Sequence, residues 1–120
     1  MRSAVREESF NSVKVFWLDT KLVLDRIRER VRILARDPRI VKVVLFGSLP
    51  EGRAVPGSDA DILIVLDQDA RSISDRIPEF TEFFSDIGIG VDVFPYTWNE
   101  LDNPVARTAL ARGVVLFSRE

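Results

Sequence analysis

Apolar residues recur at spacings of three and four in the segment from about Thr20 to Ala35, which places them on one face of a helix: Leu24, Ile27, Val31 and Leu34. Asp19 or Thr20 can cap the start of this helix. The helix is expected to end at Asp37-Pro38, because the residue before a proline is pushed away from helical backbone angles.

Short runs of β-branched and aromatic residues follow this helix and predict four strands: Ile40 to Phe46, Asp61 to Leu66, Gly90 to Phe94 and Val114 to Phe117. An earlier apolar run, VKVFWL from Val13 to Leu18, fits either a short strand or part of an N-terminal arm. Periodicity does not separate these two alternatives for so short a run.

Two more helices are predicted between and after the strands. One covers about Asp75 to Ser85 with Ser74 as its cap, and places Pro78 in or near the first turn, where proline is tolerated. The other has Asn103 as cap, Pro104 at its first position and Gly113 at its end. The alternation predicts an α/β (α+β) fold, with a small mixed sheet and helices packed mainly on one face.

Composition limits both the size and the chemistry of this fold. The chain has 120 residues, 46% apolar and 30% charged, which favours a single domain over residues 1–120. It contains no cysteine and no histidine, so thiolate and imidazole metal sites, cysteine nucleophiles and serine–histidine triads are excluded. Any catalysis must use carboxylates, hydroxyls, lysine and arginine.

The net charge of −2 gives no general attraction to nucleic acid or to an anionic membrane. We therefore expect no direct nucleic-acid binding. The N-terminus lacks the apolar core of a signal peptide, and no segment approaches the roughly 20 apolar residues needed to span a bilayer. The expected location is the cytoplasm.

The segment FGSLPEGRAVPGSDADILIVLD, residues 46–67, holds the candidate chemistry. Gly47 lets another group approach the backbone closely, and the Ser48 hydroxyl can donate to an anionic oxygen. Asp59 and Asp61 project to the same side of an extended chain, about 6.6 Å apart along the backbone. Each motif alone is also typical of a solvated turn or loop end.

A third carboxylate makes a metal site the better interpretation. Asp92 lies in the middle of GVDVF, where a charge is costly unless it is paired or ligated. Two carboxylates about 4 Å apart repel by roughly 4 kcal/mol at an effective dielectric near 20, which favours a cation between them. Oxygen-only ligation indicates a hard ion, Mg²⁺ or Mn²⁺.

These residues resemble the minimal nucleotidyltransferases, stand-alone members of the DNA polymerase beta-like nucleotidyltransferase superfamily. The resemblance rests on Gly47-Ser48, on Asp59-x-Asp61 after ten further residues, and on the later Asp92. It extends to VDVFPYTWNEL and ALARGVVLF, and covers about residues 41–117. The chain departs from many relatives in one respect, because Leu49-Pro50-Glu51 stand where those relatives carry a basic residue.

The resemblance implies a role for each residue. Asp59 and Asp61 would bridge two Mg²⁺ ions, while Asp92 would hold the catalytic ion and receive the proton of the acceptor. Gly47 and Ser48 would hold the terminal phosphates of ATP, and Arg53 would neutralise triphosphate charge, although a solvated loop arginine is an equally good interpretation.

The resemblance also implies a partner. Stand-alone chains of this kind are typically antitoxins that adenylylate a tyrosine of a HEPN-domain ribonuclease toxin, in a hetero-oligomer with it. Leu63 and Val65 agree with this, because too little chain is expected to cover them and an uncovered apolar face indicates a partner. The alternative is a non-catalytic nucleotide-binding module that neutralises its toxin by contact.

Overall fold

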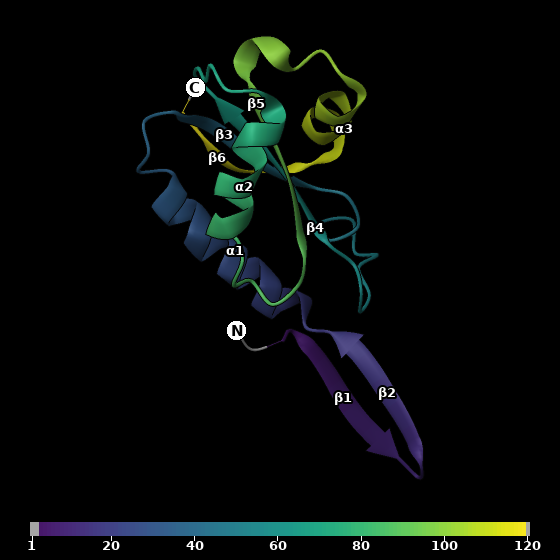
Figure 1. The fold of residues 1–120 in the computed structure, drawn as a ribbon. Coiled ribbons are helices and arrows are strands. Elements are labelled where there is room, and N and C mark those ends of the chain that lie inside the picture. Colours follow the sequence, from purple (N-terminus) through teal and green to yellow (C-terminus); the bar gives the residue numbers. More distant parts are fainter. Residues whose placement is uncertain (1–2, 120) are drawn as a thin grey trace.

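A four-stranded sheet forms the centre of the computed structural model, which describes residues 3–119 (Figure 1). Its strands are β3 (Ile40–Phe46), β4 (Ala60–Leu66), β5 (Val91–Thr97) and β6 (Val114–Ser118), in the order β5-β4-β3-β6. Strand β3 is antiparallel to β4 and β6, and β4 and β5 are parallel. The predicted mixed sheet and α/β class are confirmed.

Helices α1 (Thr20–Leu34) and α2 (Ile73–Phe83) cover one face of this sheet. The buried residues of α1 are Val23, Ile27, Val31 and Leu34. The predicted face is thus correct except for Leu24, which is half-buried beside Val23. The Asp19 carboxylate accepts a hydrogen bond from the Leu22 amide at 3.1 Å, as expected of a helix cap.

Helix α2 begins earlier than the sequence predicted. Its N-cap is Ser72 and not Ser74, so Pro78 lies in the second turn, where it removes one backbone hydrogen bond. Phe80 and Phe84 are almost fully buried beside it. Burial of two aromatic side chains stabilises the fold by several kcal/mol, roughly the size of the cost of a proline inside a helix.

Helix α3 (Pro104–Arg112) covers the opposite face of the sheet. The Asn103 side chain caps it by accepting from the Ala106 amide at 2.9 Å, and Gly113 ends it, both as predicted. The expectation that Leu63 and Val65 are uncovered was wrong, since both are buried. Small side chains on α3 explain the difference, because they allow the helix to approach the sheet closely: Ala106 and Ala109.

An N-terminal hairpin projects from this body (Figure 1). It consists of β1 (Val5–Phe10) and β2 (Val13–Leu18), so the VKVFWL run is a strand. Asn11 and Ser12 have φ of 44° and 74°, the positive values that a two-residue hairpin turn requires. The molecule is elongated, measuring 56 × 26 × 25 Å. No helix within residues 3–119 has the length and apolar character to cross a bilayer.

Candidate active site

Asp61 and Asp92 are direct neighbours across the parallel strands β4 and β5. Paired residues on adjacent strands project to the same face, and the strands lie about 4.8 Å apart. That face is the α3 side of the sheet, because Leu63 and Phe94, two residues further along each strand, pack there. The register thus places two carboxylates together at the end of the sheet where both strands begin.

Asp59 approaches this pair from the residue before β4. Its carboxylate lies against Gly90, where a Cβ atom would overlap its Oδ1. The Ala60 amide donates to the Gly90 carbonyl at 2.9 Å, which holds the start of β4 beside the loop before β5. The sequence analysis did not identify Gly90 as a site residue. The signal that could have identified it is a glycine two residues before an aspartate in an apolar strand.

Gly47 lies on the other side of Asp61. It follows β3, whose last residue, Phe46, pairs with Asp61, and a Cβ atom at Gly47 would overlap the Asp61 Oδ2. Gly47 also has φ of +82°, which side chains other than glycine's rarely allow. The Gly47-Ser48 turn therefore directly adjoins the aspartates, and Ser48 is half-buried beside it.

No arginine or lysine within residues 3–119 forms an ion pair with any of the three aspartates. Burial raises the pKa of Asp61 above its ordinary value, and the negative charges of Asp92 and Asp59 raise it further. This end of the sheet consequently has an excess of negative charge that the described side chains do not compensate.

The donors at this end suit a hard divalent cation. Mg²⁺ prefers carboxylate oxygens, keeps several of its waters and is commonly bound through one or two carboxylates. Asp61 and Asp92 meet that need, and the two glycines keep the space beside the carboxylates free of side chains. Within the described chain, no three acidic side chains are close enough to hold one ion together. Asp59 lies near enough for its charge to raise the pKa of Asp61.

Arg53 stands apart from the aspartates. Its side chain is 63% exposed and donates to Glu51 at 3.3 Å, while Arg112 of α3 contacts the same carboxylate at 2.9 Å. The Arg53 amide donates to the Ser48 carbonyl at 2.9 Å, which closes the loop. Leu49, the first residue after the Gly-Ser pair, is buried in the core. The sequence alone gave no sign that Arg112 lies beside this loop, because Arg112 belongs to α3.

Comparison with known proteins agrees with this geometry. Residues 29–120 match the family described as "Polymerase beta, Nucleotidyltransferase". Because the match spans most of the chain, the protein belongs to this nucleotidyltransferase family. No curated protein matches the chain.

Two solved structures are similar to this one. A Sulfolobus solfataricus protein assigned to the nucleotidyltransferases has a TM-score of 0.59 and 26% identity, over 83% of this chain and 84% of that chain. A toxin–antitoxin structure with AMP-PNP has a TM-score of 0.52 and 17% identity, over 86% of this chain and 76% of that chain. At 17% identity, the second similarity supports the fold alone.

Proposed function

We propose that the protein is a Mg²⁺-dependent nucleotidyltransferase that transfers AMP from ATP to a tyrosine hydroxyl of a HEPN ribonuclease toxin, and so acts as its antitoxin. The observation that carries the catalytic part is the pairing of Asp61 with Asp92 beside Gly47, with no compensating cation among the described residues. A site with this charge attracts divalent metal together with a nucleotide.

Each site residue has a role in this proposal. Asp59, Asp61 and Asp92 would hold two Mg²⁺ ions, which when bound would offset the triphosphate charge and polarise its oxygens. Asp92, which is exposed, would take the proton of the attacking hydroxyl. The Gly47-Ser48 turn would hold the terminal phosphates through its backbone amide and hydroxyl groups, and Arg53 would add positive charge at the loop.

AMP transfer needs no covalent enzyme intermediate. The tyrosine oxygen forms a bond to the α-phosphorus, and the bond from that phosphorus to the bridging oxygen of the pyrophosphate breaks. Pyrophosphate leaves with the bonding electrons, and the hydroxyl proton passes to Asp92. The protein aligns the hydroxyl with the bond that breaks.

A toxin partner has indirect support. The sequence resembles minimal nucleotidyltransferases that act as antitoxins, and a toxin–antitoxin structure holding AMP-PNP shares the fold. The described segments α3 and β6 after β5 serve the core of the domain, since α3 covers the sheet and β6 completes it, and the proposal has the toxin bring the acceptor hydroxyl.

Intact-protein mass spectrometry of the toxin tests the proposal. Incubation with the protein and Mg²⁺–ATP should raise the toxin mass by one or more AMP units and lower its ribonuclease activity. Asp92→Asn should remove the mass shift. A toxin that is fully silenced while its mass is unchanged would refute catalysis.

Such silencing without modification would favour the alternative, a module that neutralises its partner by contact. An ATP titration with and without Mg²⁺ separates the two further. The enzyme requires metal-dependent nucleotide binding, whereas a contact antitoxin does not.

A further inference from the structure

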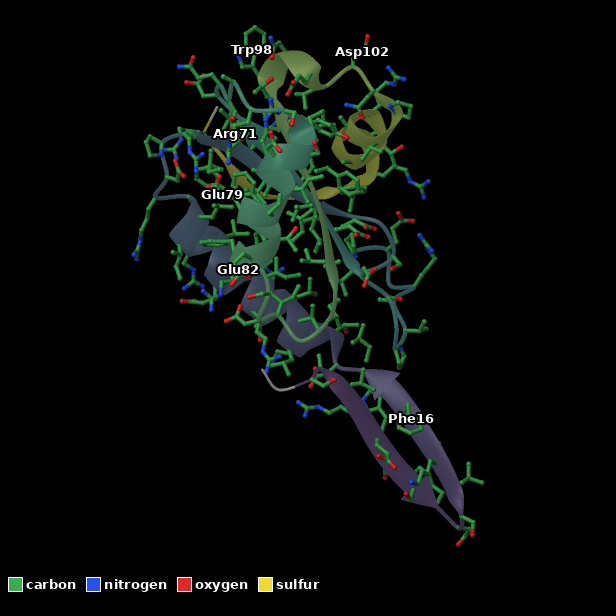
Figure 2. The ribbon with its side chains drawn as sticks, in the orientation of Figure 1. Phe16, Arg71, Glu79, Glu82, Trp98 and Asp102 are labelled. Carbon is green, nitrogen blue, oxygen red and sulfur yellow. The ribbon has the colours of Figure 1, made fainter. Side chains whose placement is uncertain are left out.

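The hairpin β1–β2 carries an apolar surface that no other described part of the chain covers. Its large exposed side chains are Phe10, Val13, Val15, Phe16 and Trp17. Figure 2 shows Phe16 on the hairpin, well separated from the helices of the body. A two-stranded hairpin is marginally stable in water and gains stability from a third strand or a packed face. We therefore expect the hairpin to pair with another strand or surface.

The two edges of the hairpin differ in charge. The β1 edge belongs to VREESF, which contains Arg6, Glu7 and Glu8, and charged side chains protect a strand edge from pairing. The β2 edge belongs to VKVFWL, in which Lys14 is the single charge. Pairing of two β1 edges around Glu7 would also bring two glutamates together. The β2 edge is the one suited to a further strand.

We propose that a second copy of this chain pairs with β2 in antiparallel orientation, so that two hairpins form one four-stranded sheet. A two-fold axis through Val15 places Val15 of each copy opposite the other. It places Val13 opposite Trp17 of the second copy, and Lys14 opposite Phe16 of the second copy. Apolar side chains then meet apolar ones, each lysine faces an aromatic ring, and no like charges are opposed.

The position of the axis is restricted by the body of the molecule. An axis through Phe16 would place Lys14 opposite Leu18, which is 7% exposed and packs in the main core where the hairpin joins α1. The hairpin base is also anchored, because the Asp19 amide donates to the Ala4 carbonyl at 2.8 Å. Pairing around Val15 keeps the added strand on the free length of the hairpin.

The area available predicts a weak dimer. Phe16 and Trp17 are 53% and 43% exposed, which leaves about 200 Å² of aromatic surface per copy. With the valines and the paired backbones, the total stays below the roughly 1,200 Å² of a standard interface. We expect a dissociation constant in the micromolar range, and hence a monomer–dimer equilibrium that depends on concentration.

Sedimentation velocity of the full chain from about 1 to about 100 μM tests the proposal at concentrations that span such an equilibrium. The wild type should shift from monomer to dimer, whereas Val15→Lys should stay monomeric because two lysines would face each other across the axis. Val115→Lys is the matched control, since Val115 is a similarly exposed valine on β6. It should dimerise as the wild type does. An equimolar mixture of Val15→Lys and Val15→Glu should recover the dimer.

A cross-link tests the register independently. The chain contains no cysteine, so Val15→Cys introduces a single thiol that should form an intermolecular disulfide on mild oxidation, while Val115→Cys should not. A wild type that stays monomeric throughout, or dimerisation that survives Val15→Lys, would overturn the proposal. A monomeric wild type whose Val15→Lys variant loses affinity for a toxin would overturn it too, and would assign the β2 edge to the toxin.

Discussion

The carboxylates at the two ends of strands β4 and β5 differ in whether they have arginine partners. At the end where the strands begin, Asp61 and Asp92 lie side by side without an arginine or lysine partner among the described residues. At the end where they finish, Asp69 and Glu100 contact Arg76, whose side chain is 3% exposed. The same sheet thus carries a compensated and an uncompensated acidic cluster.

The pKa values follow this difference. A hydrogen bond from Arg76 lowers the pKa of Glu100 to about 2, and hydrogen bonds from Arg71 hold the pKa of Asp69 well below its usual range. Burial and neighbouring aspartates raise the pKa of Asp61 instead. Carboxylates that stabilise this fold come with arginine partners of their own. Those at the other end have no such partner among the described residues, and an acidic group with a shifted pKa is typical of a functional site.

The compensated cluster extends over the surface of α2. Arg71 contacts Glu79 at 2.8 Å, and Arg39 contacts the same residue at 2.6 Å. Figure 2 shows Arg71 near the start of α2 and Glu79 further along this helix. Arg76 also donates to the carbonyls of Pro95 and Asp69, at 3.1 and 3.0 Å. This network joins the chain segments that follow β4 and β5.

The largest expected effect is on catalysis. If the proposed function is right, Asp61→Asn or Asp92→Asn should each lower the rate of AMP transfer by about a hundredfold or more, because charge stabilisation at the reacting phosphate is lost. Glu100→Gln is the control at the opposite end of the sheet and should leave transfer unchanged. The measurement is AMP incorporation into the toxin. Wild-type rates in both aspartate variants would refute the site.

The next effect is on stability. Arg76→Met should lower the free energy of unfolding by about 3 kcal/mol, because it removes the arginine partner of Glu100 and the donor to the carbonyls of Pro95 and Asp69. Arg112→Met removes an arginine that is 65% exposed and should cost less than about 1 kcal/mol. Urea unfolding of both variants checks this. Equal losses would mean that the Arg76 network is no stronger than a surface pair.

The two ends should also respond oppositely to pH. The pKa of Glu100 is lowered, so its contribution to stability is present above its ordinary pKa of 4.5 and is lost as pH falls toward about 2. The pKa of Asp61 is raised, so its contribution is full below 3.8 and is lost as pH rises through the raised pKa. Unfolding curves of Glu100→Gln across this range should show a smaller acid loss than the wild type. An unchanged acid loss would contradict the assignment.

The smallest effect concerns the uncompensated end. Without divalent cation at neutral pH, Asp61→Asn should raise the free energy of unfolding by a few tenths of a kcal/mol, since it removes repulsion between partly exposed charges. Thermal unfolding in the presence of a chelator measures this. Adding Mg²⁺ should stabilise the wild type more than the variant. A variant less stable than the wild type in chelator would show that the Asp61 carboxylate has a structural partner.

Local patterns in the sequence were sufficient for much of the fold. The α1 period, the Asn103 cap with Pro104, and the four apolar runs all depend on residues close together in the chain, and each gives the element that the structure contains. The Asp59-x-Asp61 spacing and the charge of Asp92 inside an apolar strand likewise indicated a cluster of carboxylates, because such a charge is costly unless it is paired or ligated. The candidate aspartates were therefore identifiable from the sequence.

Tertiary structure decided what lies beside these residues. The parallel pairing that aligns Asp61 with Asp92, and the contact of Gly90 with Asp59, join positions about thirty residues apart that no local pattern relates. The cover over Leu63 and Val65 depends on how closely an alanine-bearing helix can approach the sheet. The sequence by itself determined which elements form and which residues bear charge. Long-range packing determined which charges are compensated, because that depends on distances set only when the strands and helices assemble.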